Sequence, residues 1–119
     1  MRNCIGSPAR IAPLYPLFLP EMTESALRSL TWERCGVLRN GPALEGALAL
    51  LQKPSCRVES MKREGYEIRS IHTLARLIAK CALAREESRG AHYRLDFPEK
   101  RPEFLKHSMV SLAHDVQFS

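Results

Sequence analysis

Apolar residues recur with helical spacing in two stretches of the first half of the chain. In the first stretch, Thr23 can cap a helix through its hydroxyl, Leu27 and Leu30 share one face with Trp32 close by, and Gly36 ends the pattern. In the second stretch, the helix-start residues Asn40-Gly41-Pro42 precede apolar positions spaced three and four apart, which are Leu44, Ala47, Leu48 and Leu51. Pro54 bounds this pattern. Two helices are therefore predicted, one from Thr23 to Gly36 and one from Asn40 to Pro54.

The longest periodic stretch follows a polar connection over residues 53–60. Its apolar positions repeat in steps of three and four, at Ile68, Ile71, Ala75, Ile78 and Ala82, while Arg69, Arg76 and Lys80 fall on another, solvated side. The same steps lead on to Arg85 and Arg89. Because an unpaired buried guanidinium is very costly, these two arginines must emerge at the end of the bundle or pair with carboxylates or carbonyls. We predict a third helix that ends at Gly90 in the left-handed conformation.

Prolines shape both ends of the chain. Pro13, Pro16 and Pro20 make residues 1–22 a proline-rich arm or linker, whose apolar side chains Leu14, Tyr15, Leu17 and Phe18 are expected to lie over apolar surface. Pro98 and Pro102 keep the chain extended from about residue 91, and apolar residues then alternate with polar ones, as two short strands require, at Val110, Leu112, Val116 and Phe118. The predicted fold is mainly α, an antiparallel three-helix bundle with a proline-rich N-terminal arm and a short extended or β-like C-terminal tail. Residues 23–119 form its helical domain.

The composition is that of one small globular domain. A chain of 119 residues supports one core, and 18 Lys and Arg against 13 Asp and Glu give a formal net charge of +5. The aromatic residues are not interleaved with Lys and Arg, so no nucleic acid partner is expected. The apolar stretch over residues 11–20 is about half a membrane span and is broken by prolines. We therefore expect no membrane span and no export signal, and a cytoplasmic location.

The residue types that bind metals and nucleotides show no suitable spacing. The cysteines Cys4, Cys35, Cys56 and Cys81 are widely separated, and the histidines His72, His92, His107 and His114 form no metal-binding pair on one helix turn. No metal site is expected. No glycine cluster is present that would receive the pyrophosphate of a dinucleotide. We therefore expect no cofactor-binding residue and no catalytic residue in this chain.

The most specific motif lies directly after the third predicted helix. It reads Arg85-Glu86-Glu87-Ser88-Arg89-Gly90-Ala91-His92-Tyr93-Arg94-Leu95-Asp96-Phe97-Pro98-Glu99. This motif resembles the signature of the helical C-terminal domain of the succinate dehydrogenase, fumarate reductase and L-aspartate oxidase flavoproteins. Two further stretches resemble the family in order and spacing, Trp32-Glu33-Arg34-Cys35-Gly36-Val37-Leu38-Arg39 and Phe104-Leu105-Lys106-His107-Ser108. The resemblance covers about residues 25–112, and Tyr93 with Arg94 is more similar to L-aspartate oxidase than to succinate dehydrogenase.

The resemblance implies a role in an FAD enzyme that oxidises L-aspartate to iminoaspartate, the first step of bacterial NAD synthesis. In that family, the FAD-binding and substrate-capping domains precede the helical domain and hold the substrate-binding residues. The resemblance therefore implies that the chain is a docking domain without its own active site. FAD would be bound by the parent protein, whose FAD-binding and capping domains would be the partners of this domain. Two alternatives remain open, namely the C-terminal domain of a succinate dehydrogenase or fumarate reductase flavoprotein, and an independent basic helical interaction module. An arm and first helix that normally cover a neighbour would also make the isolated chain self-associate.

The polar residues of the motif form the candidate docking site. They are Arg85, Glu87, Ser88, Arg89, Gly90, His92, Arg94 and Asp96. The planar guanidinium of Arg89 is expected to bond Asp96 or nearby carbonyls and so to fix the end of the third helix. Two other interpretations stay open: Arg89 or His92 touches flavin or substrate in the parent enzyme, or the motif contacts another subunit.

Overall fold

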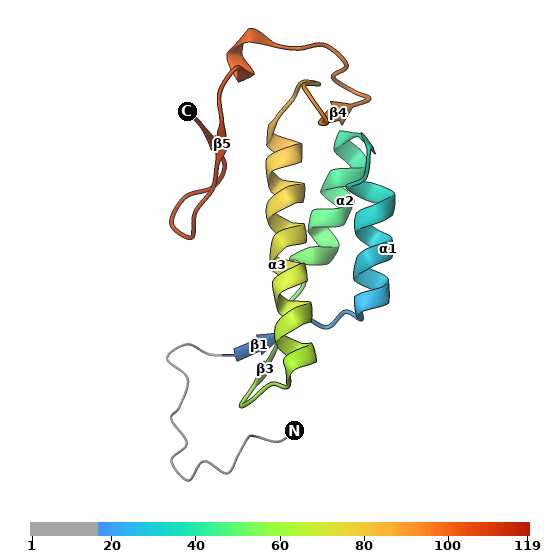
Figure 1. Ribbon diagram of the computed structural model, residues 1–119, viewed down its shortest axis with the longest axis vertical. Helices are drawn as coiled ribbons and strands as arrows, with labels where there is room; N and C mark the ends of the chain where they lie inside the picture. The colour runs from blue at the N-terminus through green and yellow to red at the C-terminus, as the bar shows by residue number, and fades with distance from the viewer. Residues whose placement is uncertain (1–16) are drawn as a thin grey trace.

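Three helices form the body of the molecule. The computed structural model describes residues 17–119, with α1 (Glu24–Arg34), α2 (Gly41–Leu51) and α3 (Arg63–Ala84). They lie side by side, and the chain runs along successive helices in alternating directions (Figure 1). The mainly helical fold with three helices is therefore confirmed. Most of the predicted arm, including Leu14 and Tyr15, lies outside the described residues.

The first two helices begin where their capping residues predict. The Thr23 hydroxyl accepts a hydrogen bond from the Ala26 amide at 3.1 Å, and the Asn40 side chain accepts one from the Ala43 amide at 2.8 Å. Each cap satisfies an amide that has no partner within the helix. Both predicted helix starts are confirmed.

The core lies between α2 and its two neighbours. Its buried apolar residues are Leu27, Leu30, Cys35, Leu44, Ala47, Leu48, Leu51, Ala75, Ala79 and Ala82. The predicted apolar stripe of α3 is partly wrong, because Ile78 is exposed while His72 is buried. The buried face of α3 is built on small residues, His72 apart. Small side chains on this face allow α2 and α3 to pack closely, while Ile78 lies beside this face and is 41% exposed.

The prediction that α3 ends at Gly90 is wrong. The helix ends at Ala84, and Arg85 leaves the helical conformation with φ −86° and ψ 95°. Gly90 does have the predicted left-handed conformation, with φ 61°, but it lies in a turn whose ends Arg89 and His92 are bridged by backbone hydrogen bonds. Helix α3 ends earlier because a side chain from further along the chain takes up its last carbonyl groups.

Three small two-stranded sheets join segments that are distant in sequence. Strand β1 (Leu17–Leu19) pairs antiparallel with β3 (Cys56–Val58), and β2 (Leu38–Arg39) pairs in parallel with β4 (Tyr93–Arg94). In the tail, a short 3-10 turn, η1 (Pro102–Phe104), precedes the antiparallel pair β5 (Ser108–Met109) and β6 (Gln117–Phe118). The predicted β-like tail is confirmed. The β1–β3 pair was not predicted, because the polar connection over residues 53–60 gave no strand signal.

Within residues 17–119, none of the helices combines the length and apolar character that crossing a bilayer requires.

Candidate functional site

The Arg94 guanidinium caps the C-terminal end of α3. This side chain is only 2% exposed, and its Nη1 donates to the carbonyl oxygens of Ala82 and Leu83, each at 2.9 Å. These carbonyls belong to the last turn of the helix, where backbone acceptors have no partner within the helix. A cation at this end also complements the helix dipole. Arg94 therefore ends α3 in place of the predicted glycine.

Asp96 connects this cap to the beginning of α2. Its carboxylate accepts from Arg94 Nε at 2.8 Å and from Nη2 at 2.7 Å, a bidentate pair. Asp96 Oδ2 also accepts from the backbone amide of Gly41 at 3.0 Å. The Arg94 guanidinium, together with the Gly41 amide, lowers the pKa of Asp96 to about 2. One ion pair thus joins the C-terminal end of α3 to the N-terminal end of α2.

Glu87 is the centre of a second ion-pair group. Its side chain is fully buried and accepts from Arg85 Nη1 at 2.7 Å, from Arg89 Nε at 2.8 Å and from the Arg101 amide at 2.9 Å. The hydrogen bonds from Arg89 lower the pKa of Glu87 to about 2, against the opposing effect of burial. Of the two partners expected for Arg89, Asp96 is therefore wrong, whereas a nearby carbonyl is correct, because Arg89 Nη2 also donates to the Arg101 carbonyl oxygen at 3.4 Å. Glu87 is two residues from Arg89, and Arg94 already occupies both oxygens of Asp96.

Arg85 attaches the tail to the end of α3. Its guanidinium donates to the carbonyl oxygens of Phe104 and Lys106 and to the Ser108 hydroxyl, and it lies 5.2 Å from the centre of the Phe118 ring. The segment Phe104-Leu105-Lys106-His107-Ser108, which carries part of the family resemblance, is therefore held by the first residue of the motif.

Ser88 and His92 hold the turn between the two ion-pair groups. The Ser88 hydroxyl oxygen accepts from the Arg94 amide at 2.9 Å and lies 2.8 Å from the Phe97 carbonyl oxygen. His92 Nε2 lies 3.0 Å from the Arg85 carbonyl oxygen, and its Nδ1 lies 3.0 Å from Arg39 Nη1. A carbonyl only accepts and a guanidinium only donates, so Nε2 carries the proton and Nδ1 accepts. Burial, together with the charge of Arg39, lowers the pKa of His92 and keeps the imidazole neutral.

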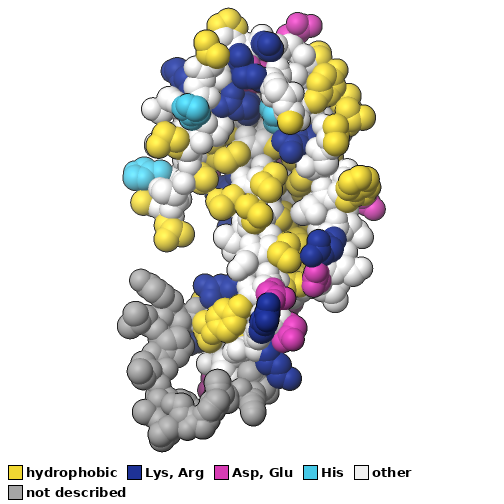
Figure 2. All heavy atoms as spheres, in the orientation of Figure 1, with side chains coloured by type: hydrophobic (Ala, Val, Ile, Leu, Met, Phe, Trp, Pro, Cys, Tyr) yellow, Lys and Arg dark blue, Asp and Glu magenta, His cyan; other side chains and the backbone are white. Residues whose placement is uncertain are grey.

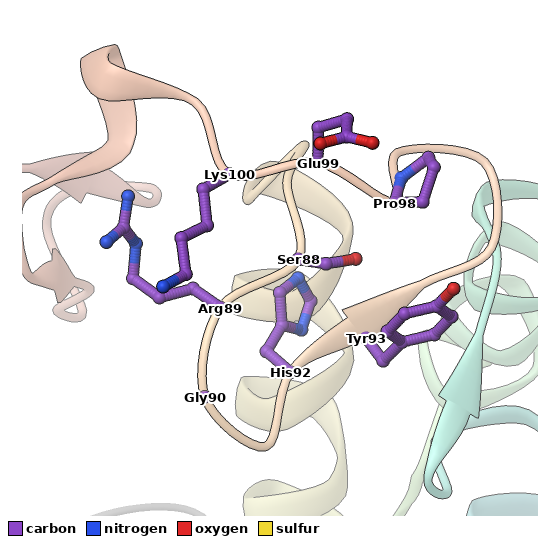
Figure 3. Close-up of a pocket in the computed structure, with 8 residues that line it drawn as sticks. All are labelled: Ser88, Arg89, Gly90, His92, Tyr93, Pro98, Glu99 and Lys100. Atoms are coloured by element: carbon purple, nitrogen blue, oxygen red, sulfur yellow. The ribbon is translucent and has the colours of Figure 1, made fainter.

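An open hollow of about 450 Å³ lies beside this turn (Figure 3). Its lining residues are Ser88, Arg89, Gly90, His92, Tyr93, Pro98, Glu99 and Lys100. Figure 3 shows that Arg89 and Lys100 extend to the same side of the loop. A wide, shallow hollow with cationic side chains on one wall is suited to contact with another protein surface rather than to enclosing a small molecule.

The N-terminal end of α2 does not fit the phosphate groups of a dinucleotide. Helix α2 follows the strand β2, but its first amide is taken by the Asp96 carboxylate and its third by the Asn40 side chain. A carboxylate at this helix end repels a pyrophosphate, which would need the same amides.

The structure brings all eight predicted motif residues to one end of the bundle. Seven of them take part in ion pairs or side-chain hydrogen bonds there, and Gly90 supplies the turn. Sequence reasoning missed three further participants, Arg39, Gly41 and Arg101. The helix-start signal at Asn40-Gly41-Pro42 marks the position of Gly41, but it does not indicate a partner 55 residues away.

Comparison with known proteins identifies the family. Residues 24–119 match the family described as Fumarate reductase flavoprotein C-term, so the chain belongs to this family of flavoprotein C-terminal domains. It is 38% identical over 96 residues to an L-aspartate oxidase of Rhodospirillum rubrum, a match that covers 81% of this chain and 33% of that protein. It is 41% identical over 83 residues to an L-aspartate oxidase of Pyrococcus furiosus, covering 70% of this chain and 16% of that protein.

Two further similarities agree with this family. A fumarate reductase (CoM/CoB) polypeptide of Methanothermobacter marburgensis is 29% identical over 110 residues, which is 83% of this chain and 20% of that protein. A chain of E. coli quinol fumarate reductase has the same fold over 83% of this chain and 20% of its own length, with a TM-score of 0.58 and 22% identity. The chain thus spans a third or less of the length of these relatives.

Proposed function

We propose that this chain is the C-terminal helical domain of an FAD-dependent L-aspartate oxidase and serves there as a docking domain without its own active site. The observation that carries the proposal is the 38–41% identity to two L-aspartate oxidases over 70–81% of the chain. The parent protein would oxidise L-aspartate to iminoaspartate and would bind FAD in the domains that precede this one.

The chemistry of the motif supports a structural role. A general base near neutral pH needs an accessible group with a matched pKa. Asp96 and Glu87 have pKa values of about 2, and both carboxylates are already bound by guanidinium groups. His92 uses both ring nitrogens within the fold. The interpretation in which the motif fixes the helix ends is thus favoured over the one in which it touches substrate.

The partners of this domain are the FAD-binding and capping domains of the parent protein. The open hollow lined by Arg89, Glu99 and Lys100 is the surface proposed for such a contact. Contact of the motif with another subunit remains an alternative for this surface.

Substrate choice tests the proposal. The complete protein that carries this domain is purified, and hydrogen peroxide is measured after addition of L-aspartate or succinate under air. Oxidation of succinate is also measured in parallel by reduction of an added dye that accepts its two electrons. Peroxide formed with L-aspartate but not with succinate supports the proposal. Activity with succinate alone contradicts it.

A second candidate function is that of a fumarate reductase or succinate dehydrogenase flavoprotein. It is favoured by the match to the fumarate reductase (CoM/CoB) polypeptide, which covers 83% of this chain. In that case the complete protein would interconvert succinate and fumarate. The third alternative is an independent basic helical module. The coding sequence tests it, because the gene of such a module would not continue upstream into a glycine-rich dinucleotide motif.

A further inference from the structure

Helix α3 has a second apolar face beside the one that forms the core. Leu74, Leu77 and Ile78 are 57%, 38% and 41% exposed, and with Cys81 they follow the i, i+3, i+4, i+7 spacing of one helix face. The core face of the same helix is formed by His72, Ala75, Ala79 and Ala82. An apolar stripe that extends beyond the core face of a helix is typical of a helix that a further surface covers.

The surroundings of this outer face define its limits. Figure 2 shows hydrophobic side chains gathered over the middle of α3, between the tail and the charged groups at the lower end of the helix. At the lower end, ion pairs join Arg28 to Glu24 and Arg63 to Glu67. There, a hollow of about 730 Å³ between α1 and α3 contains Tyr66, Ser70 and Ile71. Near the upper end, Lys80 binds Asp115 of the tail at 3.1 Å.

We propose that the outer face of α3, formed by Leu74, Leu77, Ile78 and Cys81, is the surface against which the preceding part of the parent polypeptide packs. This inference rests on the proposed function. The occupant is argued from length, since the matched region is 16–33% of the L-aspartate oxidases to which the chain is similar. The greater part of such a protein lies outside this domain and is linked to it covalently.

The small size of the face favours a tethered occupant over a second copy of the chain. Three partly exposed aliphatic side chains supply much less apolar surface than the roughly 800 Å² per partner that a stable interface between separate molecules buries. A covalent link raises the effective concentration to about the millimolar range, so a small apolar patch is sufficient. The described part of the arm is a weaker candidate, because Leu17 is already buried within the fold, where β1 pairs with β3.

Thiol labelling measures whether the outer face is covered. Leu74→Cys places a reporter on this face, and Ala49→Cys places a matched one at an exposed position of α2. Each variant is made both in the 119-residue chain and in the complete protein. Iodoacetamide labelling is followed by peptide mass spectrometry, which separates each reporter from the native cysteines. Cys81 serves as a native reporter on the same face.

In the complete protein, we expect the labelling rate of Leu74→Cys to fall at least about tenfold relative to the isolated chain, while that of Ala49→Cys stays within about twofold. An unchanged rate for Leu74→Cys overturns the proposal, and so does equal protection of both positions. Protection in the isolated chain that increases with its concentration would assign the face to a second copy, which also overturns the proposal. The labelling rate does not depend on the substrate of the enzyme. If the complete protein oxidises only succinate but Leu74→Cys is protected, the proposed function is refuted while the proposed docking face stands.

Discussion

Arg94 and Asp96 form a bidentate ion pair that joins two helix ends. Arg94 donates hydrogen bonds to carbonyl oxygens in the last turn of α3, and Asp96 accepts a hydrogen bond from the first amide of α2. The Arg94 cation thus lies at the partially negative C-terminal end of α3, and the Asp96 carboxylate lies at the partially positive N-terminal end of α2. The antiparallel arrangement of α2 and α3 depends on this contact as well as on the core between them.

Replacing Arg94 should destabilise the chain strongly. Arg94→Ala leaves two helix carbonyls and the Asp96 carboxylate without their donor, and we expect a loss of about 3 kcal/mol or more in the free energy of unfolding. Arg94→Lys should recover little, because one ammonium cannot reproduce the planar fork. Urea unfolding measures both variants.

The control for this prediction is Arg28→Ala. Arg28 and Glu24 form an ion pair in which both side chains are more than half exposed, so the loss should stay within about 0.5 kcal/mol. Similar unfolding midpoints for Arg94→Ala and Arg28→Ala would show that the Arg94 cap is not needed for stability.

The two glycines of α2 should respond in opposite ways to alanine. A Cβ at Gly41 would lie 2.8 Å from Asp96 Oδ2 and 3.2 Å from Arg94 Nη2, so Gly41→Ala should displace the ion pair and cost about 1–2 kcal/mol. A Cβ at Gly46 would meet only the terminal atoms of the Arg34 side chain, which can move aside. Gly46→Ala should therefore be neutral or add up to about 1 kcal/mol through helix propensity. Thermal unfolding that ranks the two variants in the reverse order would contradict this geometry.

Stability should fall in acid because of Glu87 and Asp96. Their pKa values in the folded chain are about 2, below the ordinary values of 4.5 and 3.8, so folding favours the ionised form. Their contribution is complete above the ordinary values and is lost as the pH falls towards 2. Glu87→Gln should be less stable at pH 7 by about 2 kcal/mol or more, and its urea midpoint should depend less on pH between about 5 and 2. Glu45→Gln, at an exposed position, is the control and should keep the full pH dependence.

His92 should remain neutral and carry its proton on Nε2. Its Nδ1 accepts from the Arg39 guanidinium, and burial lowers its pKa below the ordinary value of 6.5. The stability contributed by neutral His92 is therefore present above pH 6.5 and is lost as the pH falls through the lowered pKa. Imidazole nitrogen spectra recorded across this range report the tautomer and the midpoint. A midpoint above the ordinary value, or a proton on Nδ1, would be inconsistent with the contacts of this ring.

The features that the sequence predicted correctly are those set by neighbouring residues. Thr23 and Asn40 cap helices through amides three residues away. The tail forms the expected strand pair, although of the alternating apolar residues only Phe118 lies in a strand. The motif over residues 85–99 contains the side chains that form the two ion-pair groups at the end of α3. Periodicity alone placed Ile78 in the core wrongly, because steps of three and four fit more than one helix face.

The features that the sequence did not predict depend on distant contacts. Arg89 and Arg94 are both arginines within reach of two carboxylates, and only the folded geometry assigns Arg89 to Glu87 and Arg94 to Asp96. The Gly41 amide lies 55 residues from Asp96, and no local signal relates them. For the same reason, the helix end at Ala84 could not be predicted, because its capping group comes from Arg94.

The most direct test of the proposed function compares the 119-residue chain with the complete protein that carries it. Both are purified, their flavin absorbance is recorded, and hydrogen peroxide is measured after addition of L-aspartate under air. The complete protein should be yellow and form peroxide, while the chain alone should be colourless and inactive, because its helix N-terminus at α2 is already occupied by Asp96. A flavin band or peroxide formation by the chain alone would contradict the proposal that it is a docking domain without its own active site.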